Sequence, residues 1–175
     1  MNNEEGNRIQ ENVLKGLKSS DSQKVIETIA ELRESGNVAY IPLLIDMLIS
    51  TPDTEIRKKI RELFSNLKDN DAIPIIISAI QDPRYSPELK ALVSSCWENG
   101  LDYTKYISLF VDLLIEKDLE VAFESYTVIM NTENKIEQSI IDIQIGRLDN
   151  ALASMPELKR QLLLDVIDFL PSIGF

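Results

Sequence analysis

Apolar residues recur in this chain at helical spacing. In residues 5–18, Ile9, Val13, Leu14 and Leu17 fall at helical spacing, which places them on one face of a helix. Three other segments are apolar on every face: "IPLLIDMLI" from Ile41, "IPIIISAI" from Ile73 and "ISLFVDLLI" from Ile107. That pattern is typical of helices packed on two sides. The pattern predicts an all-α protein.

A longer period joins these segments. A branched or leucine side chain recurs at steps of 31, 33, 32 and 37 residues, at Val25, Ile56, Leu89, Val121 and Leu158. Glutamate precedes the last four, and a carboxylate in a first helical turn is stabilised by the helix dipole. Pro87 and Pro156 fit a helix start, and the other copies offer candidate N-caps at Asp21, Asp53 and Asp118.

Self-similarity at this period predicts stacked helical pairs. We expect first helices near 38–50, 71–82, 103–117 and 134–153, and second helices near 22–35, 54–68, 87–99, 119–131 and 157–170. The second helices should bury the recurring residue together with those four and eight positions later, namely Ile29, Ile60, Phe64, Val93, Trp97, Ile129, Leu162 and Val166. One domain should span residues 1–175, with an opening segment 5–18, repeats over about 21–170 and a tail at 171–175.

The segment "YIPLLIDMLISTPDTEIRKKIRELFSNL" from Tyr40 to Leu67 resembles a HEAT repeat, with an I-P-x-L helix, a short acidic turn, and a second helix that opens with a β-branched residue and arginine. The resemblance extends weakly from about Gln23 to Leu170, and that arginine occurs only as Arg57. It implies a right-handed α-α superhelix, an armadillo-type solenoid of about five helical hairpins and about ten helices. It also implies that a protein partner binds along the inner face, which second helices line.

The amino-acid composition restricts the class of partner that we expect. Lys and Arg total 18 against 29 for Asp and Glu, which gives a net charge of −11. Such a field repels phosphates and anionic headgroups, so neither nucleic acid nor a membrane is expected as a partner. The stretch "MNNEEGNRIQ" has neither the basic start nor the apolar run of a leader sequence, and Cys96 is the single cysteine, so we expect a cytoplasmic protein.

The residues two, six and nine positions after each recurring residue should point away from the core. In the first three second helices these residues are polar or small. In the last two they are Phe123, Thr127, Met130, Arg160, Leu164 and Ile167. Together with Glu124 they form the predicted protein-binding site, and the surrounding acidic residues favour a basic partner. Two alternatives remain at this point: the tail "PSIGF" covers Leu164 and Ile167, or a second copy of the chain does.

Little in the sequence points to catalysis. Histidine is absent, which excludes imidazole bases and His-based metal sites. "DND" at Asp69–Asp71 lacks the later residues of a calcium loop, and Asp165 with Asp168 has no partner nucleophile. We therefore expect no catalytic, cofactor or metal residue and a non-enzymatic interaction scaffold or regulator, monomeric or weakly dimeric. The alternative is an enzyme on a HEAT-like fold, of lyase or glycosylase type.

Overall fold

The computed structural model describes residues 11–35 and 37–175, and this part of the chain is all-helical. Residues 11–17 are helical and end the opening segment; Ile9 lies outside the described residues. The helices that follow are α2 (Ser22–Ser35), α3 (Ile41–Ser50), α4 (Thr54–Phe64), α5 (Ala72–Gln81), α6 (Leu89–Glu98), α7 (Ile107–Glu116), α8 (Leu119–Met130), α9 (Gln138–Leu152) and α10 (Glu157–Phe169). Within these residues there is no strand, and no helix is long and apolar enough to cross a membrane.

Short 3-10 helices precede α3, α6 and α7, and a fourth follows α10. They are η1 (Val38–Tyr40), η2 (Pro83–Glu88), η3 (Thr104–Tyr106) and η4 (Leu170–Ile173). The predicted spans agree closely with the observed helices, which confirms the all-α class.

Aspartates start the helices where the sequence indicated them. The Asp53 carboxylate accepts the backbone N–H groups of Glu55 and Ile56, and Asp118 accepts that of Val121. The two "PEL" copies differ from each other. Pro156 is the N-cap of α10, whereas Pro87 lies inside η2 and α6 begins only at Leu89.

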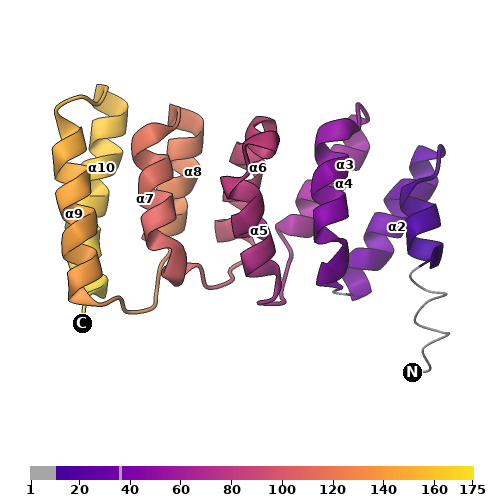
Figure 1. Ribbon diagram of the computed structural model, residues 1–175, viewed down its shortest axis with the longest axis horizontal. Helices are drawn as coiled ribbons and strands as arrows, with labels where there is room; N and C mark the ends of the chain where they lie inside the picture. The colour runs from indigo at the N-terminus through magenta and orange to yellow at the C-terminus, as the bar shows by residue number, and fades with distance from the viewer. Residues whose placement is uncertain (1–10, 36) are drawn as a thin grey trace.

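The helices lie in chain order as a row of neighbouring pairs, from α2 at one end to α9 and α10 at the other (Figure 1). The second helices contact one another in sequence, α2 with α4, α4 with α6, α6 with α8, and α8 with α10. Among the first helices, α3 contacts α5 and α7 contacts α9. Each pair therefore buries its apolar side chains against the adjacent pair.

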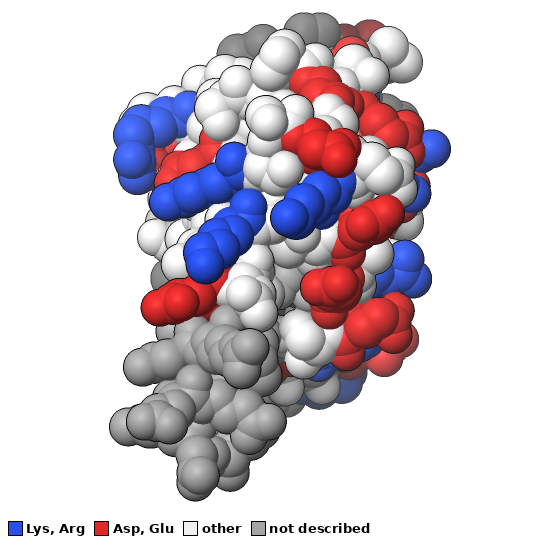
Figure 2. Space-filling model, turned by 90° about the vertical axis from the view of Figure 1, so that its right-hand side faces the viewer, with Lys and Arg blue, Asp and Glu red and all other residues white. Residues whose placement is uncertain are grey.

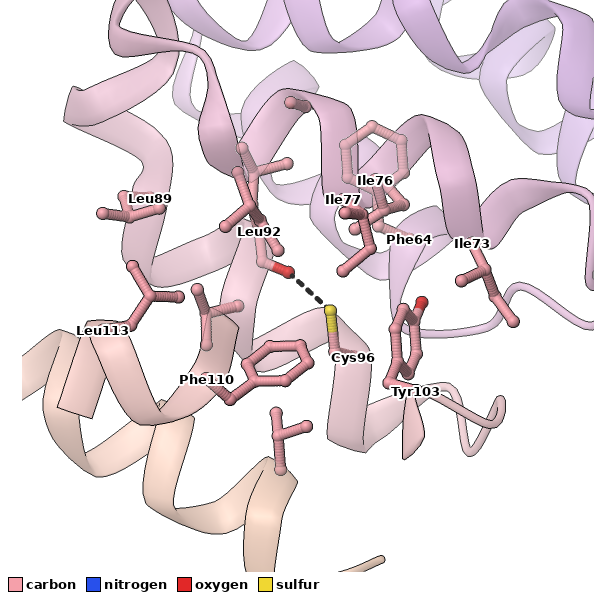
Figure 3. Close-up of a cluster of buried hydrophobic side chains, with 14 of the residues drawn as sticks. Phe64, Ile73, Ile76, Ile77, Leu89, Leu92, Cys96, Tyr103, Phe110 and Leu113 are labelled. Atoms are coloured by element: carbon pink, nitrogen blue, oxygen red, sulfur yellow. Dashed lines mark hydrogen bonds between the residues drawn. The ribbon is translucent and has the colours of Figure 1, made fainter. Parts of the chain in front are cut away.

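The core is continuous between the pairs. Figure 3 shows Phe64, Ile76, Leu92 and Phe110, which come from four different helices, packed around Cys96. The Cys96 thiol donates a hydrogen bond to the Leu92 carbonyl, and burial raises its pKa to about 12. Since the thiolate is the reactive form, Cys96 acts as a small core residue.

The predicted buried ladder is wrong at Trp97 and Leu158, and Leu162 is only partly buried. Trp97 is 38% exposed and Leu158 is 69% exposed. In α10 the buried residue is instead Lys159, whose ammonium donates to the carbonyls of Ile115 and Lys117, at 2.6 Å each, at the end of α7. These carbonyls have no partner within α7, so the lysine supplies the donors that they lack. The inward face of α10 therefore includes Val166 as expected, but is centred on Lys159, Leu163 and Leu170 in place of Leu158 and Leu162.

Candidate protein-binding groove

Large apolar side chains are exposed along α8 and α10. Leu119 is 44% exposed, Phe123 is 53% exposed and Leu158 is 69% exposed. Together with Leu162 they line a groove of about 420 Å³, whose remaining lining residues are Glu120, Glu124 and Lys90. We call this feature the α8–α10 groove.

The packing of α8 explains why these side chains reach the surface. Its buried residues, Val121, Ala122, Ser125, Val128 and Ile129, form the face that packs within the row. Leu119 and Phe123 lie on the opposite side, one helical turn apart. The Phe123 ring stacks on Tyr126 of the same helix, at 6.1 Å between centroids, which holds it at the surface of α8.

Charged groups form the α6 side of the groove. The Lys90 ammonium donates to Glu120 at 3.0 Å, and this hydrogen bond, followed by the charge of Glu120, raises the pKa of Lys90. Glu124 accepts the indole N–H of Trp97 at 2.9 Å. Among the described residues no Lys or Arg forms an ion pair with Glu124, whose charge acts on Lys90 only from a distance and after that of Glu120 in raising the pKa of Lys90.

The structure brings only part of the predicted site together. Phe123 and Glu124 line the groove, whereas Thr127 and Met130 lie farther along α8. The Thr127 hydroxyl donates to the Phe123 carbonyl, and Met130 is half-buried against the core.

The predicted residues of α10 do not line the groove. The Arg160 guanidinium donates to the carbonyls of Leu152 and Met155, where α9 turns into α10. Leu164 is 40% exposed and Ile167 is half-buried, and neither side chain lines the groove. In their place the groove contains Leu158 and Leu162, which the sequence analysis had assigned to the core.

One signal in the sequence predicts which face of α10 is buried. Leu163, Val166 and Leu170 fall at helical spacing and are buried, and four residues before Leu163 stands Lys159. A lysine can take such an inward position because its long side chain reaches helix-terminal carbonyls with its ammonium.

The C-terminal tail lies elsewhere. The backbone of Ile136 pairs with that of Ile173 and Phe175, and the Lys135 ammonium donates to the Ser172 carbonyl. Ile173 is buried by this pairing before α9. Leu164 stays exposed, so the tail is not a cover for it.

Asp69 and Asp165, the candidates for calcium binding and for acid–base chemistry, form hydrogen bonds to residues close to them in the chain. Asp69 accepts the backbone N–H of Asp71, and Asp165 accepts the side-chain amide of Gln161. Within residues 11–35 and 37–175, no group of three His, Cys, Asp or Glu side chains could hold a metal ion.

Comparison with known proteins gives no match for this sequence. The sequence matches no protein-family model, and no curated protein is similar to it. Function is therefore inferred from the groove itself.

Proposed function

We propose that this protein is a non-enzymatic binding module. In this proposal its helical hairpins stack as a right-handed, HEAT-like superhelix, and a partner protein docks in the α8–α10 groove. The contacts between successive second helices, and between neighbouring first helices, support the stacked arrangement.

The observation that carries the proposal is the gathering of Leu119, Phe123 and Leu158 in one groove, each more than two-fifths exposed. Contiguous exposed apolar side chains on a small protein usually mark an interaction site. Full burial of one such side chain contributes roughly 1.5 to 3 kcal/mol, so burying the exposed parts of three would supply a large share of a binding energy. Aromatic residues at the centre of such surfaces often contribute most.

Charge supports a basic partner. The groove has two carboxylates against one ammonium, and the whole chain carries a net charge of −11. Such a field attracts cationic surfaces and increases their association rate at low salt.

The test is affinity capture from the native cell with three baits: wild type, Phe123→Asp combined with Leu158→Asp, and Ile143→Asp. Ile143 is a matched control because it is 59% exposed but lies on α9. We expect proteins bound by wild type and by Ile143→Asp to be lost from the double variant, with all three baits equally helical by circular dichroism. Equal recovery with the double variant would reject the groove as the binding site.

A further inference from the structure

The chemistry of the groove specifies the kind of segment that fits it. We propose that its occupant is an amphipathic helix of another protein, with two large apolar side chains one turn apart and Lys or Arg residues beside them. This inference rests on the proposed function and adds the nature of the partner to it.

The shape of the groove favours a helix. Leu119 and Phe123 are four residues apart on α8, as are Leu158 and Leu162 on α10. With a rise of 1.5 Å per residue, each pair is spaced by about 6 Å. A partner helix repeats this spacing with apolar side chains at i and i+4.

The backbone of the walls argues against an extended segment. Extended peptides gain affinity by pairing their backbone with the edge of a sheet. Both walls of the α8–α10 groove are helices, which pair their backbone groups internally beyond the first turn and so present no edge of alternating N–H and C=O groups to an extended segment. A docked helix satisfies its own backbone internally, so it leaves no polar group unpaired when the apolar face is buried.

The carboxylates select the flanking charges. Glu120 and Glu124 are one turn apart on α8, and both contact residues of α6, namely Lys90 and Trp97. Lys90 balances Glu120, whereas Glu124 has only the neutral indole donor. A Lys or Arg of the partner placed against Glu124 forms a charge-assisted hydrogen bond, while an acidic partner, including a second copy of this chain, adds repulsion.

The molecule contains its own reporter for this contact. Trp97 is the single tryptophan of the chain, and its indole is bonded to the carboxylate in question. A cation that engages Glu124 changes the surroundings of that indole, and so the tryptophan emission.

The experiment starts from a display library of random peptides of about 16 residues, long enough for four helical turns, panned on the wild-type protein. Enriched peptides without tryptophan are then titrated and followed by Trp97 emission. We expect them to carry apolar pairs at i and i+3 or i+4 and a positive net charge. Affinity should fall at least about 10-fold with Phe123→Asp and about 3- to 10-fold with Glu124→Gln, which keeps an acceptor for the indole but removes the charge.

Two matched controls should bind as wild type: Ile143→Asp, and Glu31→Gln on α2, which removes the same charge at a distant exposed position. Peptides that require Phe123 but are neutral or acidic would overturn the inference and leave the proposed function standing. Peptides that bind Phe123→Asp as tightly as wild type would overturn both. A wild-type dimer in light scattering that Phe123→Asp dissociates would make a second copy the occupant and also overturn the inference.

Discussion

The outward surface differs between the N-terminal and C-terminal second helices. On α4, Lys59 pairs with Glu62 at 2.9 Å and Lys58 lies 3.9 Å from the same carboxylate, while Arg57 and Arg61 pair with Glu88, which is itself buried. Figure 2 looks at the molecule from the end where α2 lies, and side chains of both signs lie next to one another there. Around α8 and α10 the surface instead exposes Phe123 and Leu158.

The two regions share one packing scheme. In both, each second helix contacts the next one, and the residues that make this contact are buried. The outward positions are free of this constraint, so they can carry self-paired charges in one region and an open apolar groove in the other. Under the proposed function, α2 and α4 stabilise the row, while α8 and α10 bind the partner.

The largest effect should come from breaking the packing that both regions share. Ile60 is 0% exposed at the centre of α4, so Ile60→Asp buries an unpaired carboxylate and opens a cavity. We expect a loss of more than about 4 kcal/mol in the free energy of unfolding, measured by urea denaturation and circular dichroism. The Phe123 side chain is already exposed to solvent, so Phe123→Asp should change the free energy of unfolding by less than about 0.5 kcal/mol. Similar losses for the two variants would contradict the division between core and groove.

A smaller effect should come from the ion pairs of the N-terminal region. Glu88 is 3% exposed and accepts hydrogen bonds from Arg57 and Arg61, while Arg57 also donates to the Leu48 carbonyl at the end of α3. Glu88→Gln should cost about 2 to 3 kcal/mol, below the loss for a fully buried pair because both arginines can still reach water. The same denaturation experiment measures it, with Glu31→Gln as the exposed control. A change below that of the control would show that this cluster does not join α4 to α6.

The smallest effect should be a pH dependence at the start of α4. The Ser22 hydroxyl, then the backbone N–H groups of Ile56 and Glu55, lower the pKa of Asp53 below its ordinary value of 3.8. Because the folded pKa is lowered, the stabilisation is present above that value and is lost as the pH falls through the folded pKa. Between pH 5 and pH 3, the Tm of wild type should therefore decrease by more than the Tm of Asp53→Asn. Parallel Tm curves for the two proteins would show that the charge of Asp53 does not contribute.

The helices could be predicted from sequence because their ends have local causes. Asp53 and Asp118 cap α4 and α8 with their own carboxylates, and the apolar spacing within each helix fixes its inward face. Where the apolar spacing was ambiguous, in α10, a tertiary contact decided the register. Lys159 is buried because its ammonium meets the carbonyl end of α7, a partner 42 residues away along the chain.

The same contact explains why the predicted site residues of α10 do not line the groove. Placing Leu158 in the core assigned Leu164 and Ile167 to the binding surface, whereas the groove uses Leu158 and Leu162. Phe123 and Glu124 do line the groove, because α8 follows the regular pattern. The pairing of Trp97 with Glu124 could not be predicted, since it depends on the distance between neighbouring second helices.

Hydrogen–deuterium exchange on the protein alone and with a bound peptide from the selection tests the division between the two regions most directly. We predict slower exchange on binding over residues 119–124 and 158–162, with residues 22–64 unchanged. Protection confined to residues 22–64 would place the binding surface on the charged N-terminal helices and contradict the account.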